Sequence, residues 1–365
     1  MYQPMTITLA DAWLHDLSPF LVRFTNTLGI RYYGLAYALA FVFGYLMLRR
    51  LSMRGLVRIP PHRVGDAILT IVLGVVLGGR IGYVLLYDPA LILDFSSNPP
   101  WWGVLAINKG GMASHGGIVG VIVASWWISR GWKTPDGTLE GRCSMLHVLD
   151  VMALLAPVGL GLGRLANFVN GELLGRIAAL PGQAAPWWSV KFPQEILTSH
   201  YSGRTPAQVD ALNALAARYA HPGELLSDSY ERLIAMVQAG GAQGHRVAAE
   251  LGPLLAARHP SQLYQAFAEG PVLGLALFLI WARPRKPGVV GAWFMILYGV
   301  LRITTEFWRL PDDILKVQRV LGLSRGQWFS TLMVLVGTVV LVRVLRSDTT
   351  PMGGWKNHAP ARGKD

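Results

Sequence analysis

Long apolar segments with few charged residues set the tightest limit on how this chain folds. Several approach the roughly 20 residues that a helix needs to cross a bilayer, and all exceed the length of an ordinary buried strand. They cover residues 32–48, 67–86, 112–128, 146–163, 262–282, 289–305 and 328–342. The pattern predicts an all-α polytopic membrane protein with about seven transmembrane helices.

Composition agrees with a location in lipid. Of the 365 residues, 52% are hydrophobic and 15% are charged, against about 25% charged in an average soluble domain. These values exclude a disordered or fibrous protein. A net charge of +12 would suggest a nucleic-acid partner for a soluble protein, but the positions of the basic residues explain the charge better, and we expect no nucleic acid to bind.

Basic residues concentrate in alternate loops. Five arginines lie in residues 49–63, and residues 130–142, 283–286 and 343–365 are also basic. Loops on the cytoplasmic side of membrane proteins carry an excess of Lys and Arg. Seven crossings with the N-terminus outside and the C-terminus in the cytoplasm satisfy this rule.

Hydrophobicity falls between the fourth and fifth apolar segments. There, Thr205 and Pro206 form an N-cap and first-turn pair before a helix of soluble character, which predicts a helical extramembrane insert on the outer face. We therefore expect four regions: transmembrane segments 1 to 4 in residues 1–175, the insert in 176–258, segments 5 to 7 in 259–345, and a basic cytoplasmic tail in 346–365.

The single cysteine, Cys143, lies in an expected cytoplasmic loop and excludes an intramolecular disulfide. Because there is no CxxC motif or Cys/His cluster, the sequence predicts neither a metal site nor a redox cofactor. The N-terminus lacks the basic, apolar and small-residue regions of a secretory signal, so we expect the mature chain to begin near Met1.

Ionisable residues inside membrane segments are costly and are usually functional. Arg80 is one such residue, beside Gly74, Gly78 and Gly82, whose four-residue spacing permits close approach of another helix. For Arg80, a structural ion pair, contact with a lipid headgroup and a catalytic role are all open. His115 lies between two glycine pairs at the outer start of a span, where a neutral imidazole would suit a general base; a structural histidine is the alternative.

The densest polar cluster is GLGRLANFVNGELLGR, residues 161–176. Arg164, Asn167 and Asn170 recur every three residues, and Glu172 and Gly175 follow. A guanidinium with two amides and a carboxylate offers several donors for an anionic oxygen cluster, since arginine binds phosphate in a bidentate manner. A helix C-terminus fraying into the insert is the alternative, but it requires only one capping residue.

Two further clusters belong to the last three spans. Arg302, Glu306 and Arg309 have the i, i+4 and i+7 spacing of one helical face, so an intrahelical ion pair is the simplest interpretation. His259, Ser261, Gln262 and Tyr264 precede the fifth span, as a polar mouth would, and Glu269 lies inside it. Together these clusters predict a site for a phosphate-bearing membrane lipid near the outer leaflet.

The same segments resemble the bacterial prolipoprotein diacylglyceryl transferases. Residues 161–176 are similar to that family's signature, G-x-G-R-x-G-N-F-x-N-G-E-x-x-G, and RYYGLAY, GGRIGYVLLY, GGMASHGG, HPSQLYQAFAEG and YGVLRITTEFWR resemble its other blocks in the same order. Ala166 replaces a glycine of the pattern, Gln265 replaces an expected glutamate, and the insert is longer than usual.

The resemblance implies transfer of the diacylglyceryl group from phosphatidylglycerol to the lipobox cysteine thiol of a preprolipoprotein. The products would be a thioether and glycerol phosphate, at the bacterial inner membrane. Because the substrate supplies the nucleophile, the enzyme needs no cysteine of its own. The partners are then phosphatidylglycerol, the lipobox segment and membrane lipid.

Within that reaction, His115 is the candidate base, and Arg164 and Arg302 are expected to hold the phosphate. Tyr33, Asn167 and Asn170 would orient headgroup hydroxyls, Glu172 and Glu306 would hold arginines, and Gly175 would allow close approach. We place Arg80, His259, Ser261, Gln262 and Tyr264 among the substrate-binding residues.

A lipid transporter or flippase is the main rival, because buried arginines and histidines line many transport paths. It predicts sequence repeats, and we find none. A membrane protease is less compatible, since the chain has no HExxH motif and no evident pair of intramembrane aspartates.

Overall fold

The computed structural model describes residues 12–24, 29–107, 110–198, 202–310 and 323–356. Within these ranges the chain is mainly helical, and its strands are two to four residues long. The chain start at Met1 and residues 357–365 of the expected tail lie outside the described residues.

Every predicted membrane segment coincides with helical structure. The spans are α1 (Tyr32–Met53), α2 (Val64–Leu86), α3 (Ser114–Ser129), α4 (Met145–Asn170), α8 (Ser261–Phe267) with α9 (Leu273–Ile280), α10 (Val289–Glu306) and α11 (Arg325–Arg346). Six of the spans are long and apolar enough to cross a membrane. The exception, α3, has 16 residues and is about 24 Å long at 1.5 Å per residue. The expected fold class, an all-α polytopic membrane protein, is confirmed.

Two spans differ from their predicted bounds in ways that affect the polar residues. Helix α4 continues seven residues past the expected end at Gly163 and reaches Asn170, so Arg164 and Asn167 lie on a regular helix. The fifth span is interrupted by a π-helical segment, η7 (Ala268–Val272), which contains Pro271. Proline removes a helical hydrogen bond, and π-turns are frequent at functional sites.

Contacts between residues in space divide the chain into two compact units, and each unit consists of three chain segments. Unit 1 comprises residues 1–38, 159–272 and 298–332, and unit 2 comprises 39–158, 273–297 and 333–365. Most of the predicted site residues belong to unit 1, whereas Arg80 and His115 belong to unit 2.

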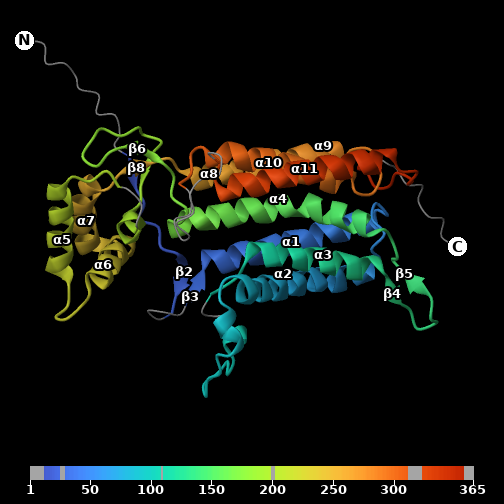
Figure 1. Cartoon of the computed structure of the whole chain (residues 1–365), viewed down its shortest axis with the longest axis horizontal. Helices are drawn as coiled ribbons and strands as arrows, with labels where there is room; N and C mark the ends of the chain where they lie inside the picture. Colours follow the sequence, from blue (N-terminus) through green and yellow to red (C-terminus); the bar gives the residue numbers. More distant parts are fainter. Residues whose placement is uncertain (1–11, 25–28, 108–109, 199–201, 311–322, 357–365) are drawn as a thin grey trace, which may run out of the picture. The chain divides into compact units, whose positions relative to one another are not determined.

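In unit 2, glycines bring α2 and α3 into direct backbone contact. A Cβ atom at Gly78 would overlap the carbonyl oxygen of Gly116, and one at Gly120 would overlap that of Gly74. The two helices lie side by side in Figure 1. Close approach of a second helix, expected from the glycine spacing, is therefore confirmed, and α3 is the partner.

Unit 2 also displays the surface that a bilayer requires. On α2, large apolar side chains recur every four residues and are about half exposed: Leu69, Leu73, Leu77, Ile81 and Leu85. A continuous apolar stripe of this kind suits contact with lipid.

A buried carboxylate, Asp150 of α4, accepts the backbone N–H groups of Gly288 and Gly291, at 2.7 Å each, and so caps the start of α10.

Unit 2 further contains the hairpin β4 (Trp132–Lys133) and β5 (Leu139–Glu140). Short 3₁₀ turns follow α1 at η1 (Pro61–Arg63) and follow α2 at η2 (Pro89–Ile92) and η3 (Gly103–Leu105). The β4–β5 hairpin joins α3 to α4.

Unit 1 contains a small four-stranded sheet that the sequence did not predict. Its order is β1 (Trp13–Leu14), β7 (Val190–Lys191), β8 (Ala257–Arg258) and β6 (Ile177–Ala179). β1 is parallel to β7, and the other pairs are antiparallel. A separate hairpin pairs β2 (Phe20–Arg23) with β3 (Gly29–Arg31). Because β6 and β8 begin and end the insert, the sheet joins its two ends.

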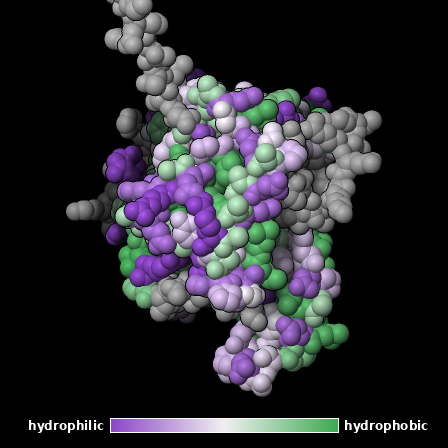
Figure 2. Space-filling view, turned by 90° about the vertical axis from the view of Figure 1, so that its left-hand side faces the viewer, coloured by the Kyte–Doolittle hydropathy of each residue, from purple (hydrophilic) through white to green (hydrophobic). Residues whose placement is uncertain are grey.

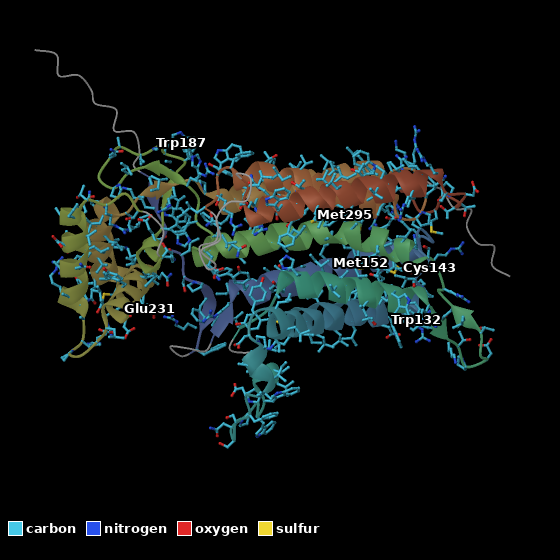
Figure 3. All side chains as sticks on the ribbon, in the orientation of Figure 1. Trp132, Cys143, Met152, Trp187, Glu231 and Met295 are labelled. Atoms are coloured by element: carbon cyan, nitrogen blue, oxygen red, sulfur yellow. The ribbon has the colours of Figure 1, made fainter. Side chains whose placement is uncertain are left out.

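The insert is helical, as expected, and has its own core. It contains η5 (Pro193–Leu197), α5 (Pro206–Tyr219), α6 (Leu226–Ala239), α7 (Gly241–Leu251) and η6 (Gly252–Leu254). Thr205 and Gln208 form a complete capping box, confirming the predicted N-cap. Buried residues from the three α-helices form one cluster that includes Leu215, Leu233 and Leu251. Hydrophilic side chains gather over the insert in Figure 2, and the loop residue Trp187 is labelled in Figure 3.

Candidate active site

Arg164 is held by a carboxylate from a different span. Its Nε lies 2.8 Å from Glu269 Oε2, and its Nη2 lies 3.4 Å from Oε1. Glu269 lies on η7 and is fully buried. The helices approach closely because Gly161 has no side chain: a Cβ there would lie 3.2 Å from Gly270 Cα. Glu269 therefore neutralises an arginine from another span.

Tyr298 on α10 connects the two arginines expected to bind phosphate. Its hydroxyl interacts with Arg164, and it lies within electrostatic range of Arg302 and Glu269. Tyr298 and Arg302 are four residues apart on α10 and so share a face. Tyr298 thus contacts one of the two guanidiniums and lies within electrostatic range of the other. Sequence analysis missed Tyr298, although its spacing from Arg302 was a usable signal.

Arg302 forms the predicted pair with Glu306. Arg302 Nη1 lies 2.6 Å from Glu306 Oε2, and Arg309 Nη1 lies 3.5 Å from the same oxygen. Ser324 donates its hydroxyl to the other carboxylate oxygen at 3.2 Å. However, α10 ends at Glu306, so the expectation that Arg309 continues its helical face was wrong. Arg309 reaches Glu306 from the turn after the helix.

Asn167, Asn170 and Glu172 form a second polar group with Tyr33 of α1. Tyr33 donates its hydroxyl to Glu172 Oε2 at 3.0 Å and accepts a hydrogen bond from Asn167 Nδ2. Asn170 Nδ2 lies 3.2 Å from Glu172 Oε1. We expected Glu172 to hold an arginine, but within the described residues its carboxylate is occupied by a phenol and two amides.

The two polar groups belong to one site. The charge of Arg164 acts on the Tyr33 phenol, which places them within electrostatic range of each other. Arginines, amides, phenols and carboxylates from four elements (α1, α4, η7 and α10) thus lie together in unit 1. Such a set can hold the oxygens of a phosphate and of neighbouring hydroxyls. In the described part of the chain, no three His, Cys, Asp or Glu residues are grouped as they would be to hold a metal ion.

The loop after α4 takes a tight path that depends on glycine. Gly171 and Leu173 have positive φ angles of 65° and 55°. A Cβ at Gly175 would overlap the carbonyl oxygen of His259. Gly175 therefore permits close approach, as expected, but the group that approaches is the chain's own backbone.

Ser261 and Gln262 hold this loop in place. Ser261 donates its hydroxyl to the carbonyl of Leu173 at 3.2 Å, and Gln262 donates its amide to the carbonyl of Glu172. These contacts position the signature loop, and Gln262 Oε1 accepts no hydrogen bond among the described residues. We expected these two residues to form part of a polar entrance for substrate, and their observed partners are backbone carbonyls of the loop.

His259 and Tyr264 form the rest of that region. The His259 ring lies 4.8 Å from the Trp188 ring, and its Nδ1 lies 3.4 Å from the Tyr264 hydroxyl. Burial lowers the pKa of His259 below its usual value, and the charge of Arg176 acts in the same direction. The imidazole is therefore neutral at pH 7.

A buried charge cluster ties the insert to the signature loop. Glu195 receives hydrogen bonds from Arg204, at 2.6 Å, and from Arg258. Arg258 also donates to the carbonyl of Gly175 at 3.1 Å. Desolvation by burial is the main influence on Arg204 and lowers its pKa. Sequence analysis missed this cluster, because its members are far apart in the chain.

Gln265, which replaces the glutamate of the family pattern, is fully buried on α8. Neither of its amide atoms has a hydrogen-bond partner among the described residues. It lies between Gln262, which contacts the signature loop, and Glu269, which contacts Arg164. Gln265 therefore has unused hydrogen-bonding capacity at a buried position between these two residues in the sequence.

Arg80 has a structural environment in unit 2. Its guanidinium donates to the carbonyls of Val104, Gly110, Gly111 and Gly103 at 2.6–2.9 Å, and its side chain is buried. Four of its five N–H donors are therefore used to fix the 103–111 loop. We had placed Arg80 among the substrate-binding residues, and these contacts favour the structural alternative.

His115 is the second residue of α3 and is exposed. Its position at the start of the helix agrees with the prediction. Because His115 belongs to unit 2 and the arginine site to unit 1, its assignment as the base remains a prediction.

Comparison with known proteins gives a consistent result. The family model for prolipoprotein diacylglyceryl transferase matches residues 19–343. This chain belongs to the prolipoprotein diacylglyceryl transferase family. Curated proteins named phosphatidylglycerol--prolipoprotein diacylglyceryl transferase are similar along almost their whole length. The protein from Bdellovibrio bacteriovorus is 36% identical over 94% of this chain and 97% of its own.

Two further relatives carry the same name. The protein from Ralstonia pickettii is 36% identical over 92% of this chain and 95% of its own, and that from Neisseria gonorrhoeae is 34% identical over 90% and 96%. As a family member, the chain is a multi-pass membrane transferase of lipoprotein biosynthesis.

Proposed function

We propose that the chain transfers the diacylglyceryl group of phosphatidylglycerol to the lipobox cysteine of a preprolipoprotein. The carbon–oxygen bond between the diacylglyceryl group and the phosphate breaks, and a carbon–sulfur bond forms. The thiol proton passes to a base, and glycerol phosphate leaves with the bonding electrons. This is the first step of lipoprotein maturation.

The observation that carries the proposal is that Tyr298 contacts Arg164 through its hydroxyl and lies within electrostatic range of Arg302. Each guanidinium comes from a different span and is oriented by a carboxylate, Glu269 or Glu306. As the carbon–oxygen bond breaks, negative charge grows on the leaving phosphate. Donors that are already in place stabilise that charge without reorganising, and each contributes about 10² to 10³ in rate.

Activation of the thiol is assigned to His115. A free thiol has a pKa near 8.5, so only a few per cent is thiolate at pH 7. A neutral imidazole can accept the proton, and general bases contribute about 10² to 10⁴ in rate. The sixteen-residue helix α3 begins one residue before His115, which places the imidazole at a span end rather than in its middle.

The second polar group suits the headgroup glycerol. Asn167 and Asn170 can each donate and accept, and the Tyr33 hydroxyl lies between Asn167 and Glu172. The buried amide of Gln265 adds an unused donor and acceptor on the α8 face. We assign these side chains to the hydroxyls and phosphate oxygens of phosphatidylglycerol.

We place the chain in the bacterial inner membrane, with its N-terminus and insert in the periplasm and its C-terminus in the cytoplasm. The bias of basic residues toward alternate loops supports this orientation. It puts the arginine site near the outer leaflet, beside the insert to which Arg258 connects it.

The direct test incubates purified protein with phosphatidylglycerol labelled in its acyl chains and a lipobox peptide. We expect the peptide cysteine to gain the mass of one diacylglyceryl group and glycerol phosphate to appear in equal amount. Translocation of labelled lipid without any mass gain would contradict the proposal and favour the transporter alternative.

The base assignment has its own test in the same assay. His115→Gln should lower the rate at pH 7 by about 10² or more and should lose less at pH 9, where the peptide thiol ionises unaided. Near-normal turnover of His115→Gln at pH 7 would show that another group, or the field of Arg302, generates the thiolate.

A further inference from the structure

Unit 2 contains a basic cavity, and its lining includes none of the residues of the arginine site. It has a volume of about 1180 Å³ and is lined by the end of α1, residues 54–62, β5 and the segment after it, the start of α4 and residues 351–353. All of these lie in unit 2. Pockets that hold drug-sized molecules have volumes of about 300–1,000 Å³, so the cavity has room for a phospholipid headgroup.

The cavity carries excess positive charge. Its lining includes Arg54, Arg58 and Arg142, with Glu140 as its one carboxylate. Glu140 is already engaged: Arg63 Nε lies 2.7 Å and His62 Nε2 lies 2.9 Å from its Oε1. These two partners hold the pKa of Glu140 below its usual value. The carboxylate is therefore unavailable to the three arginines.

The three guanidiniums have no hydrogen-bond or ion-pair partner within the ranges that the structure describes. All three residues are exposed. The loop that carries Arg54 and Arg58 is held in place by two hydrogen bonds. The backbone N–H of Arg58 donates to Nε2 of the buried His147 at 3.3 Å, and Ser52 donates its hydroxyl to the carbonyl of Ile59. The loop at residues 54–62 thus presents Arg54 and Arg58 without a partner among the described residues.

The depth of the cavity suits a headgroup. Its lining residues directly follow α1 at Met53 and directly precede α4 at Met145. The ends of membrane spans lie at the level of lipid phosphates. Exposed apolar side chains share the lining, namely Met53 and Leu139. This combination of unpaired guanidinium groups and apolar contacts at a span end matches a phospholipid better than a small soluble anion.

We propose that this cavity binds the phosphate of an anionic phospholipid from the leaflet on the basic side of the protein. Basic pockets between span ends on the cytoplasmic side recognise anionic headgroups, and arginine binds phosphate in a bidentate manner. The inference rests on the proposed orientation only for naming that leaflet cytoplasmic. It does not depend on the transferase reaction.

The test must separate this cavity from the arginine site, because both attract anionic lipid. We would therefore use the full chain carrying Arg164→Gln and Arg302→Gln, and count retained phosphatidylglycerol and phosphatidylcholine by native mass spectrometry. We expect one phosphatidylglycerol to remain bound in this background. Adding Arg54→Gln, Arg58→Gln and Arg142→Gln should weaken its retention about tenfold or more.

A matched control removes the same charge elsewhere in unit 2. Lys133→Gln, Arg343→Gln and Arg346→Gln change three exposed basic residues that do not line the cavity. We expect this variant to retain lipid within about twofold of its parent, because it removes the same number of charges and leaves every lining residue of the cavity unchanged. If the triple cavity variant fails to fold, Arg58→Gln alone should still weaken retention measurably.

Three results would overturn the proposal. One is equal lipid retention by the cavity variant and the control variant. Another is equal retention of phosphatidylcholine and phosphatidylglycerol. The third is displacement of the signal by inorganic phosphate or glycerol phosphate at concentrations that match the lipid, which would assign the cavity to a soluble phosphate. Loss of transferase activity in the parent background would bear on the proposed function alone.

Discussion

Two arginines inside membrane spans, Arg80 and Arg164, have opposite environments. Arg80 is surrounded by backbone carbonyls of one short loop, which occupy four of its donors. Arg164 is paired with the carboxylate of Glu269 and contacts the hydroxyl of Tyr298, which come from two other spans. Both residues follow glycines in the sequence.

From this difference we propose that the type of partner, more than burial, separates a structural arginine from one that can bind a ligand. Carbonyls of a loop satisfy a guanidinium and fix the loop, so the arginine has little capacity for a ligand. A single carboxylate orients one edge of a guanidinium and leaves other donors for a phosphate. The comparison can be tested by making the same substitution at each position.

Arg164→Lys should have the largest effect on activity. Lysine keeps the positive charge that Glu269 requires, so no buried carboxylate is left unpaired. It loses the planar fork that grips phosphate, and we expect the transfer rate to fall by about 10² to 10³. The measurement is the initial rate of peptide modification at saturating phosphatidylglycerol, beside the thermal unfolding midpoint.

The control for Arg164→Lys is a measurement of its thermal stability. The unfolding midpoint of Arg164→Lys should stay within a few degrees of the parent. A variant that unfolds early and keeps its rate per folded molecule would show that Arg164 is structural, and the comparison with Arg80 would fail.

Tyr33→Phe should have the next largest effect. The phenylalanine keeps the ring but removes the hydroxyl between Asn167 and Glu172. We expect the transfer rate to fall about tenfold, which corresponds to the loss of one ordinary hydrogen bond. If headgroup orientation is the role, the loss should be smaller with a phosphatidyl lipid that lacks the glycerol hydroxyls, and an equal loss on both lipids would contradict it.

Arg80→Lys should have the opposite pattern to the one expected for Arg164→Lys, with a loss of stability and little loss of rate. A lysine ammonium cannot satisfy all the carbonyls that Arg80 now bonds, and each buried carbonyl left without a donor costs about 1–3 kcal/mol. We expect a lower unfolding midpoint and faster proteolysis within residues 103–111, with the rate per folded molecule within a few-fold of the parent. A large loss of rate without any change in stability would instead assign Arg80 to the substrate.

Much of the fold was predictable from hydrophobicity alone. Seven apolar segments coincide with helical structure because lipid requires long helices and leaves few alternatives. The glycine spacing at Gly74, Gly78 and Gly82 also predicted close helix packing. The sheet of β1, β6, β7 and β8 was not predictable, because its strands are too short to show alternation.

The candidate site was predictable as a set of residue types but not as a set of contacts. Arg164 and Arg302 stand out because charge in lipid is costly. Tyr298 and Glu269 come from spans other than that of Arg164, so their contacts with Arg164 require the tertiary structure. Ser261 and Gln262 were expected to face a substrate, and only the observed backbone partners show that they hold a loop.

Cys143→Ser should have the smallest effect on activity, because the single thiol of the chain is poorly suited to act as a nucleophile. Burial raises the pKa of Cys143 to about 11, despite the opposing charge of Arg58. At pH 8 only about one thiol in 10³ would be ionised. Cys143 lies in the loop before α4 in unit 2 and is labelled in Figure 3.

Alkylation of the folded protein should therefore be slow at pH 7 and rise about tenfold per pH unit up to pH 11, because the thiolate is the reacting form. A free lipobox peptide, with an ordinary thiol pKa, should be alkylated far faster at pH 7, and the transfer rate of Cys143→Ser should match the parent. Rapid alkylation of Cys143 at pH 7 that abolishes transfer would place this thiol in the reaction. The assignment of the nucleophile to the lipobox cysteine of the substrate would then have to be abandoned.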